Sequence, residues 1–123
     1  MVIDDSHFDR LIAKKIIERS QLVANIMLLS SAIDAVEHFK LEKGEAIPEI
    51  IFLDISMPDM DGFGFLKKFE SFRADIQQKC KIVMLSSTVV PSEWEKAKES
   101  RNVAGFISKP LTPEKLSAVV GSL

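Results

Sequence analysis

The sequence predicts an α/β fold, a doubly wound parallel sheet of five strands with helices on both faces. Five short apolar segments, at residues 1–3, 25–29, 50–54, 81–85 and 103–107, are each followed by a stretch whose apolar residues have helical spacing. Residues 50–53 are apolar at every position, as expected for a strand that is covered on both faces. The alternation of strand and helix therefore favours parallel strands joined by helical crossovers.

Bulk properties are those of one ordinary globular domain. The chain has 123 residues, 46% hydrophobic and 28% charged, so we expect residues 1–123 to form a single domain. The net charge of −2, with no clustered Lys and Arg, argues against nucleic-acid binding. No apolar segment is long enough to cross a membrane, and Cys80 is the only cysteine, which favours a reducing, cytoplasmic location.

The first strand, residues 1–3, runs directly into Asp4 and Asp5. Ser6 and Asp9 then form an S-x-x-D capping pair that starts a helix. Two acids in succession exceed what one helix cap requires. Helical spacing predicts that this helix buries Phe8, Leu11, Ile12 and Ile16.

The second strand is predicted at residues 25–29 and the next helix at 32–41, with Gly44 closing it. The third strand ends on Asp54, and Pro58 and Gly62 break the chain before the following helix. Residues 74–80 are polar and are predicted to be a connection, although this connection is long for an α/β loop. Helical spacing predicts that the helix after the third strand buries Phe63, Leu66, Phe69 and Phe72.

The fourth strand ends at Ser86, and Pro91 begins a helix whose apolar side is thin, with Trp94 and Ala97 as its main members. The fifth strand leads to Lys109, which is followed by a proline. Thr112 and Pro113 then start the last helix. The predicted buried stripe of that helix is Leu116, Val119, Val120 and Leu123.

Parallel crossovers place the carboxyl ends of all strands at one edge of the sheet, where open α/β sheets bind ligands. Each polar residue expected there also has an ordinary explanation as a cap, a turn hydroxyl or a solvated charge. Together they are more informative, because carboxylates about 4 Å apart repel by roughly 4 kcal/mol at an effective dielectric near 20. A shared proton or a hard divalent cation such as Mg²⁺ would relieve that repulsion. A lysine and a hydroxyl opposite the metal would resemble a clamp for phosphoryl oxygens. The residues concerned are Asp4, Asp5, Asp54, Ser86 and Lys109.

With these residues in place, the sequence resembles the receiver domain of two-component response regulators, in particular the stand-alone, chemotaxis-type members. The resemblance covers residues 2–123. Each motif alone is weak, whereas five in order at this spacing are specific. The motifs are VIDDS at 2–6, FLDISMP at 52–58, MDG at 60–62, Ser86 after Leu85, and Lys109-Pro110.

The resemblance implies a Mg²⁺ site around the phosphoacceptor. Asp54 matches the residue that is phosphorylated. Asp5 and Asp54 match side-chain ligands of Mg²⁺, and Asp4 matches an acid that acts mostly through a metal-bound water. The backbone carbonyl of Ser56 matches the remaining protein ligand.

The resemblance also implies how the phosphoryl group is held and what fold surrounds it. Ser86 and Lys109 match the groups that hold the phosphoryl oxygens, and Phe106 matches the aromatic switch position. The implied fold is flavodoxin-like, with strand order 2-1-3-4-5. A cis peptide bond is expected between Lys109 and Pro110, as is usual at this place in the family.

The implied function is that of a phosphoacceptor in a two-component phosphorelay. A histidine kinase or histidine phosphotransfer protein would phosphorylate Asp54, and the domain would catalyse only its own phosphorylation and dephosphorylation. The surface formed by the helix after the fourth strand, the fifth strand and the last helix would then shift to control a protein partner. Ser56 and Thr88 occupy positions that tune the lifetime of the phosphoryl group in this family. Candidate partner contacts are Val89, Val90, Trp94 and Phe106.

Three alternatives remain open to comparison. A pseudo-receiver that only binds partners would lack one of the five site residues, and this chain keeps all five. An aspartate-nucleophile phosphohydrolase would carry a second acid two residues after the nucleophile, where this chain has Ser56. A flavin-binding protein would need a phosphate-binding loop after the first strand, where Asp4 and Asp5 would repel phosphate.

Overall fold

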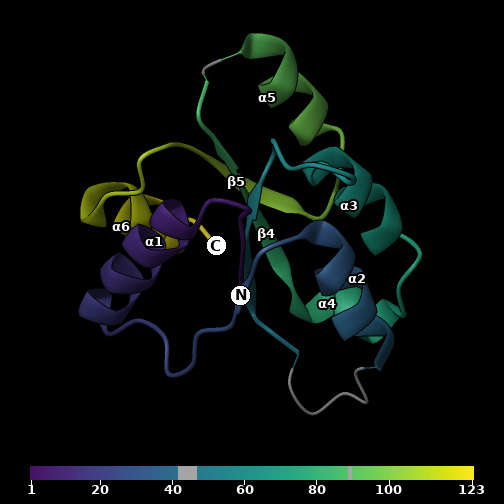
Figure 1. Ribbon diagram of the computed structural model, residues 1–123, viewed down its shortest axis with the longest axis horizontal. Helices are drawn as coiled ribbons and strands as arrows, with labels where there is room; N and C mark the ends of the chain where they lie inside the picture. Colours follow the sequence, from purple (N-terminus) through teal and green to yellow (C-terminus); the bar gives the residue numbers. More distant parts are fainter. Residues whose placement is uncertain (42–46, 89) are drawn as a thin grey trace.

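The computed structural model describes residues 1–41, 47–88 and 90–123, and its centre is a parallel sheet of five strands. The strand order is β2-β1-β3-β4-β5, as predicted, and each neighbouring pair is parallel. In Figure 1 the sheet lies between two groups of helices. The strands are β1 (Val2–Ile3), β2 (Leu28–Leu29), β3 (Ile50–Asp54), β4 (Lys81–Ser86) and β5 (Val103–Ser108).

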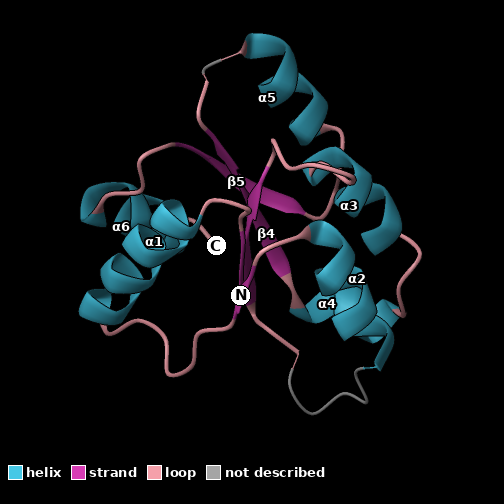
Figure 2. Ribbon diagram, viewed as in Figure 1, coloured by secondary structure: helices cyan, strands magenta, loops and turns pink. Residues whose placement is uncertain are grey.

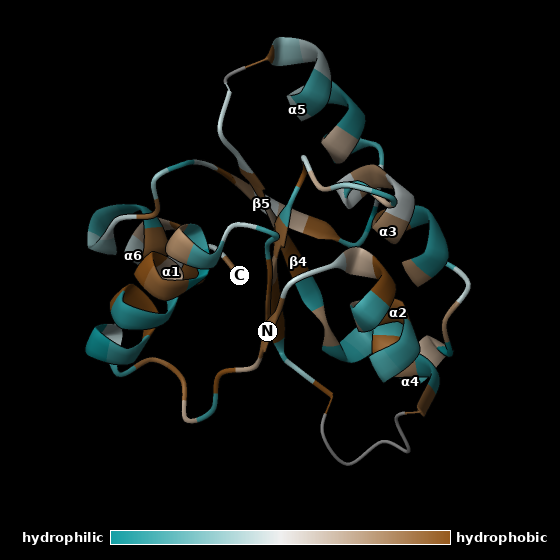
Figure 3. Ribbon diagram, viewed as in Figure 1, coloured by the Kyte–Doolittle hydropathy of each residue, from teal (hydrophilic) through white to brown (hydrophobic). Residues whose placement is uncertain are grey.

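The helices divide between the two faces of the sheet (Figure 2). One face is covered by α1 (His7–Ser20) and α6 (Pro113–Gly121), which share a core with the strand residues Phe52 and Val83. The opposite face has a larger core built around the aromatic residues of α2 and α3. Figure 3 shows hydrophobic residues concentrated in the strands between these layers. The helices over the larger core are α2 (Ala32–Leu41), α3 (Gly62–Phe69), α4 (Ala74–Lys79) and α5 (Pro91–Lys98).

Strand β2 is shorter than the sequence predicted. Of residues 25–29, only Leu28 and Leu29 form strand pairs, with Val2 and Ile3 of β1. Because β2 is an edge strand and its neighbour has two paired residues, the ladder extends beyond them only to the Met27 carbonyl oxygen, which accepts from the Val2 N–H at 2.8 Å.

The predicted buried stripe of α1 is wrong at its first two members. Phe8 is 71% exposed and Leu11 is 40% exposed, while Ala13 and Ile17 are the buried residues of the helix. Ile16 is half-buried against the same core. Apolar residues of α1 occupy more than one side of the helix, so periodicity alone does not decide which side faces α6 and the sheet.

The prediction that residues 74–80 are only a polar connection is wrong, because this segment contains the short helix α4. Ile76 is 2% exposed and anchors this helix in the larger core. The Gln77 amide donates to the carbonyl oxygen of Phe72 at 2.7 Å, which joins the turn before α4 to the helix. A six-residue helix with one buried side chain is too short to produce a periodic signal.

The remaining helices follow their predicted faces closely. In α3, Leu66 and Phe69 are buried as expected, and Phe65, which was not predicted, is fully buried beside them. In α5, Ala97 is buried and Trp94 is 36% exposed, so its apolar side is thin as predicted. The predicted stripe residues Phe63, Phe72, Val119, Val120 and Leu123 are half-buried.

Two predictions fall on positions that cannot be compared, since Gly44 and Val89 lie outside the described residues. Over the described part of the chain, none of the helices has both the length and the apolar character needed to cross a bilayer.

Candidate functional site

The predicted polar edge of the sheet is present, because β1, β3 and β5 end close together. Asp4 follows β1, Asp54 is the last residue of β3, and Lys109 follows β5. The backbone N–H of Lys109 donates to the carbonyl oxygen of Ser86 at 2.7 Å, which ties the end of β5 to the end of β4. The Lys109–Pro110 peptide bond is cis, as predicted.

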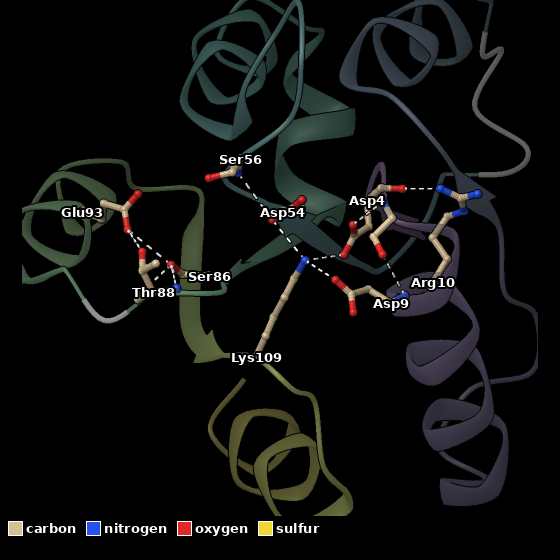
Figure 4. Close-up of polar contacts among 10 residues, drawn as sticks. Asp4, Asp9, Arg10, Asp54, Ser56, Ser86, Thr88, Glu93 and Lys109 are labelled. Atoms are coloured by element: carbon tan, nitrogen blue, oxygen red, sulfur yellow. Dashed lines mark hydrogen bonds and ion pairs between the residues drawn. The ribbon is translucent and has the colours of Figure 1, made fainter.

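Lys109 is the centre of this edge (Figure 4). Its Nζ lies 2.7 Å from Oδ2 of Asp4, 3.0 Å from Oδ2 of Asp9 and 3.3 Å from Oδ1 of Asp54. The side chains of Asp4 and Asp54 are 1% and 5% exposed, whereas that of Asp9 is 36% exposed. One ammonium group therefore neutralises part of a cluster that carries more negative than positive charge.

Asp9 is a member of this cluster that the sequence did not reveal. Its position in the first turn of α1 was expected, and its backbone N–H donates the capping hydrogen bond to Ser6 Oγ at 3.2 Å. The ion pair with Lys109 joins residues 100 positions apart, so only the docking of α1 beside β5 brings them together.

Burial and neighbouring groups shift the pKa values of Asp54 and Lys109. Burial and the negative charge of Asp4 raise the pKa of Asp54 from its usual 3.8 to about 7, although Lys109 acts in the opposite direction. Burial alone would lower the pKa of Lys109, but its hydrogen bonds to Asp4 and Asp9 raise that pKa overall. Lys109 is thus positively charged at neutral pH. The ionised form of Asp54 is destabilised unless a further cation binds beside it.

The residues present fit a hard divalent cation. Each of Asp4, Asp5 and Asp54 offers a carboxylate oxygen, and these oxygens lie within 4.8 Å of one another. Asp5 is exposed, whereas the other two are buried, so the set opens to solvent on one side. Oxygen ligands with excess negative charge are the donor set that Mg²⁺ prefers in proteins.

Local backbone contacts hold the acids in place. The N–H of Ser6 donates to Oδ1 of Asp4 at 2.9 Å, and the Arg10 guanidinium donates to the Asp4 carbonyl oxygen at 2.7 Å. On the other strand, the N–H of Ser56 donates to Oδ1 of Asp54 at 3.4 Å. Gly62 packs against the same strand end, where a Cβ atom would lie 2.7 Å from the Asp54 carbonyl oxygen. A side chain at position 62 would therefore displace the end of β3.

Ser86 lies at the same edge but its hydroxyl makes contacts away from the lysine cluster (Figure 4). The residue is 3% exposed. Its hydroxyl donates to the carbonyl oxygen of Thr88 and lies 3.2 Å from Oε1 of Glu93, at the start of α5. Next to this turn, Phe106 of β5 is half-buried, and its ring centroid is 5.1 Å from that of Trp94.

Comparison with known proteins identifies the family. The response regulator receiver domain family matches residues 1–121 of this chain. The chain belongs to this family. The predicted family and the predicted strand order are therefore both confirmed.

Among solved structures, a two-component response regulator from Cytophaga hutchinsonii is 28% identical, with a TM-score of 0.90, over 98% of this chain and 91% of that one. A response regulator receiver protein from Dyadobacter fermentans is 27% identical, with a TM-score of 0.82, over 97% and 94% of the two chains.

Curated relatives are longer proteins. The sensor histidine kinase CheAY of Helicobacter pylori is 29% identical over 123 residues, which are 98% of this chain and 14% of that protein. Protein-glutamate methylesterase/protein-glutamine glutaminase 5 of Myxococcus xanthus is 27% identical over 125 residues, which are 100% of this chain and 34% of that protein. This chain thus spans a minor part of the length of both relatives.

Proposed function

We propose that this domain receives a phosphoryl group on Asp54 from a histidine kinase or a histidine phosphotransfer protein. The observation that carries the proposal is the buried Asp54 carboxylate, 3.3 Å from Lys109 and grouped with the carboxylates of Asp4 and Asp5. A carboxylate oxygen of Asp54 would attack phosphorus as the bond to the histidine nitrogen breaks, and the released imidazole would keep that electron pair. The product is an acyl phosphate on Asp54.

Each site residue has a distinct task in that transfer. Asp4, Asp5, Asp54 and the backbone carbonyl of Ser56 would hold Mg²⁺, which would supply positive charge to offset the negative charge of the carboxylate and the incoming phosphoryl group. Lys109 remains charged at neutral pH and would bind a phosphoryl oxygen through the ammonium that now contacts Asp54. No second acid stands two residues after Asp54, so this arrangement supports self-phosphorylation rather than hydrolysis of other phosphates.

Output is proposed to leave through the surface formed by α5, β5 and α6. This surface contains Trp94, packed edge-to-face on Phe106, and Val90, which is 39% exposed. Movement of Ser86 toward the phosphoryl group would vacate space next to Phe106, and the ring could then turn inward. The thin buried side of α5 supports this role, since a weakly anchored helix moves at low cost.

The test is covalent labelling with acetyl phosphate and Mg²⁺, followed by intact mass measurement. The protein should gain one phosphoryl group that mild base removes, and Asp54→Asn should gain none. Asp59→Asn is the matched control, because Asp59 is an exposed acid in the same loop that lies outside the carboxylate cluster. Labelling that persists in Asp54→Asn would exclude Asp54 as the phosphoacceptor.

A further inference from the structure

The turn between β4 and α5 contains a hydrogen-bonded group that the phosphotransfer site does not require. Ser86, Thr88 and Glu93 meet there, away from Lys109 and its acids (Figure 4). Oε1 of Glu93 lies 3.2 Å from the Ser86 hydroxyl oxygen and 3.4 Å from the Thr88 hydroxyl oxygen. The N–H of Thr88 donates to the Ser86 hydroxyl at 3.2 Å.

A serine hydroxyl has one proton to donate, and here both of its acceptors are on the α5 side. These acceptors are the carbonyl oxygen of Thr88 and the carboxylate of Glu93. Under the proposed function, a phosphoryl oxygen on Asp54 would need that same proton. The phosphoryl group and Glu93 would therefore compete for the Ser86 hydroxyl.

Glu93 is well placed to affect this competition because it belongs to α5. It lies in the first turn of the helix, directly before Trp94, which packs on Phe106. The only buried residue of α5 is Ala97, among the residues that the structure describes. With so little buried surface, the contacts of Glu93 with the two hydroxyls are a substantial part of what holds the beginning of α5 against the turn.

We propose that Glu93 is a positioning residue for the phosphotransfer site. Through its contacts with the hydroxyls of Ser86 and Thr88, it keeps the Ser86 hydroxyl directed away from Asp54 and α5 close to the end of β4. It thereby lowers the affinity of the site for a phosphoryl group and opposes the active arrangement. This inference rests on the proposed role of Asp54. A contact that is made only in the inactive state stabilises that state. It therefore lowers the apparent affinity of the domain for a ligand that binds only the active state.

The experiment is a titration of beryllofluoride, a phosphoryl mimic, in the presence of Mg²⁺, with backbone amide chemical shifts as the readout. Glu93→Ala should bind beryllofluoride about fivefold more tightly than the wild type, the change expected when one ordinary hydrogen bond is lost from the inactive state. Glu93→Gln keeps a side-chain oxygen that accepts from Ser86 and should stay within about twofold of the wild type. Glu95→Ala is the matched control, since Glu95 is an exposed acid on the same helix whose partner is Lys98, 3.6 Å away.

A double-mutant cycle shows whether Glu93 acts through Ser86. In the Ser86→Ala background, Glu93→Ala should no longer change the beryllofluoride affinity. An equal gain in both backgrounds would overturn the inference, because Glu93 would then act through its charge or through helix stability. An unchanged affinity in Glu93→Ala, with normal labelling of Asp54, would also overturn it.

Failure of the proposed function gives a different result. The wild type would then take no phosphoryl group from acetyl phosphate, and beryllofluoride would shift no amide near Asp54. Both the proposed function and the role of Glu93 would be excluded.

Discussion

The raised pKa of Asp54 predicts that the metal-free domain loses stability as the pH rises. The carboxyl group titrates near 3.8 when exposed and at about 7 in the folded chain. Between these values the folded state binds more protons than the unfolded state, so the free energy of unfolding falls with increasing pH. The loss of stability that comes from ionising the buried Asp54 carboxyl is absent below about pH 4 and complete above about pH 7. At roughly 1.36 kcal/mol for each pKa unit, it amounts to about 4 kcal/mol at most.

Urea unfolding in the presence of a chelator measures this penalty. Asp54→Asn removes the ionisable group, so the variant should be more stable than the wild type by up to about 4 kcal/mol above pH 7 and close to it near pH 4. Asp59→Asn is the matched control, because it changes an exposed acid outside the carboxylate cluster. Saturating Mg²⁺ should abolish most of the advantage of Asp54→Asn, because the cation stabilises the ionised carboxylate.

The reasoning would be refuted if the difference in stability between Asp54→Asn and the wild type were the same at both pH values. That result would mean that Lys109 fully compensates the buried charge at 3.3 Å. It would also mean that the folded site has no need of a further cation.

Three further predictions address the metal, the tryptophan and the switch. Asp5→Asn should weaken Mg²⁺ binding by about tenfold or more in calorimetry, because it removes a proposed direct ligand, and Asp4→Asn should do less; the opposite order would contradict the proposed roles. Mg²⁺ alone should scarcely quench the fluorescence of Trp94, because this residue lies on α5 beside Phe106; a large saturable quench would mean that the indole senses the metal directly. Ser86→Ala should still be phosphorylated but should show smaller amide shifts in α5 and β5 on adding beryllofluoride with Mg²⁺; shifts equal to those of the wild type would exclude the hydroxyl as the link.

Local patterns were sufficient for the sheet and for the positions of most of the site. Apolar segments alternating with amphipathic ones predict parallel strands, and parallel strands bring their carboxyl ends to one edge. That is why the sequence alone groups Asp4, Asp54 and Lys109, and in the structure Lys109 contacts both acids. The short capping motifs and the glycine after the third strand likewise report local geometry, which a few neighbouring residues determine.

Other features depended on how distant elements dock. Phe8 and Ile17 both satisfy a helical pattern, yet the first is exposed and the second buried, because the packing of α1 against α6 selects one side of the helix. Asp9 meets Lys109 across 100 residues of sequence. The contact between the Ser86 hydroxyl and Glu93, at 3.2 Å, depends on how α5 docks beside the end of β4. The sequence by itself determined which chemical groups reach the edge of the sheet, because the local pattern predicts parallel strands and the resemblance to a known family implies their order. Only the tertiary structure decided which partner each group binds, because that depends on side-chain packing between segments far apart in the chain.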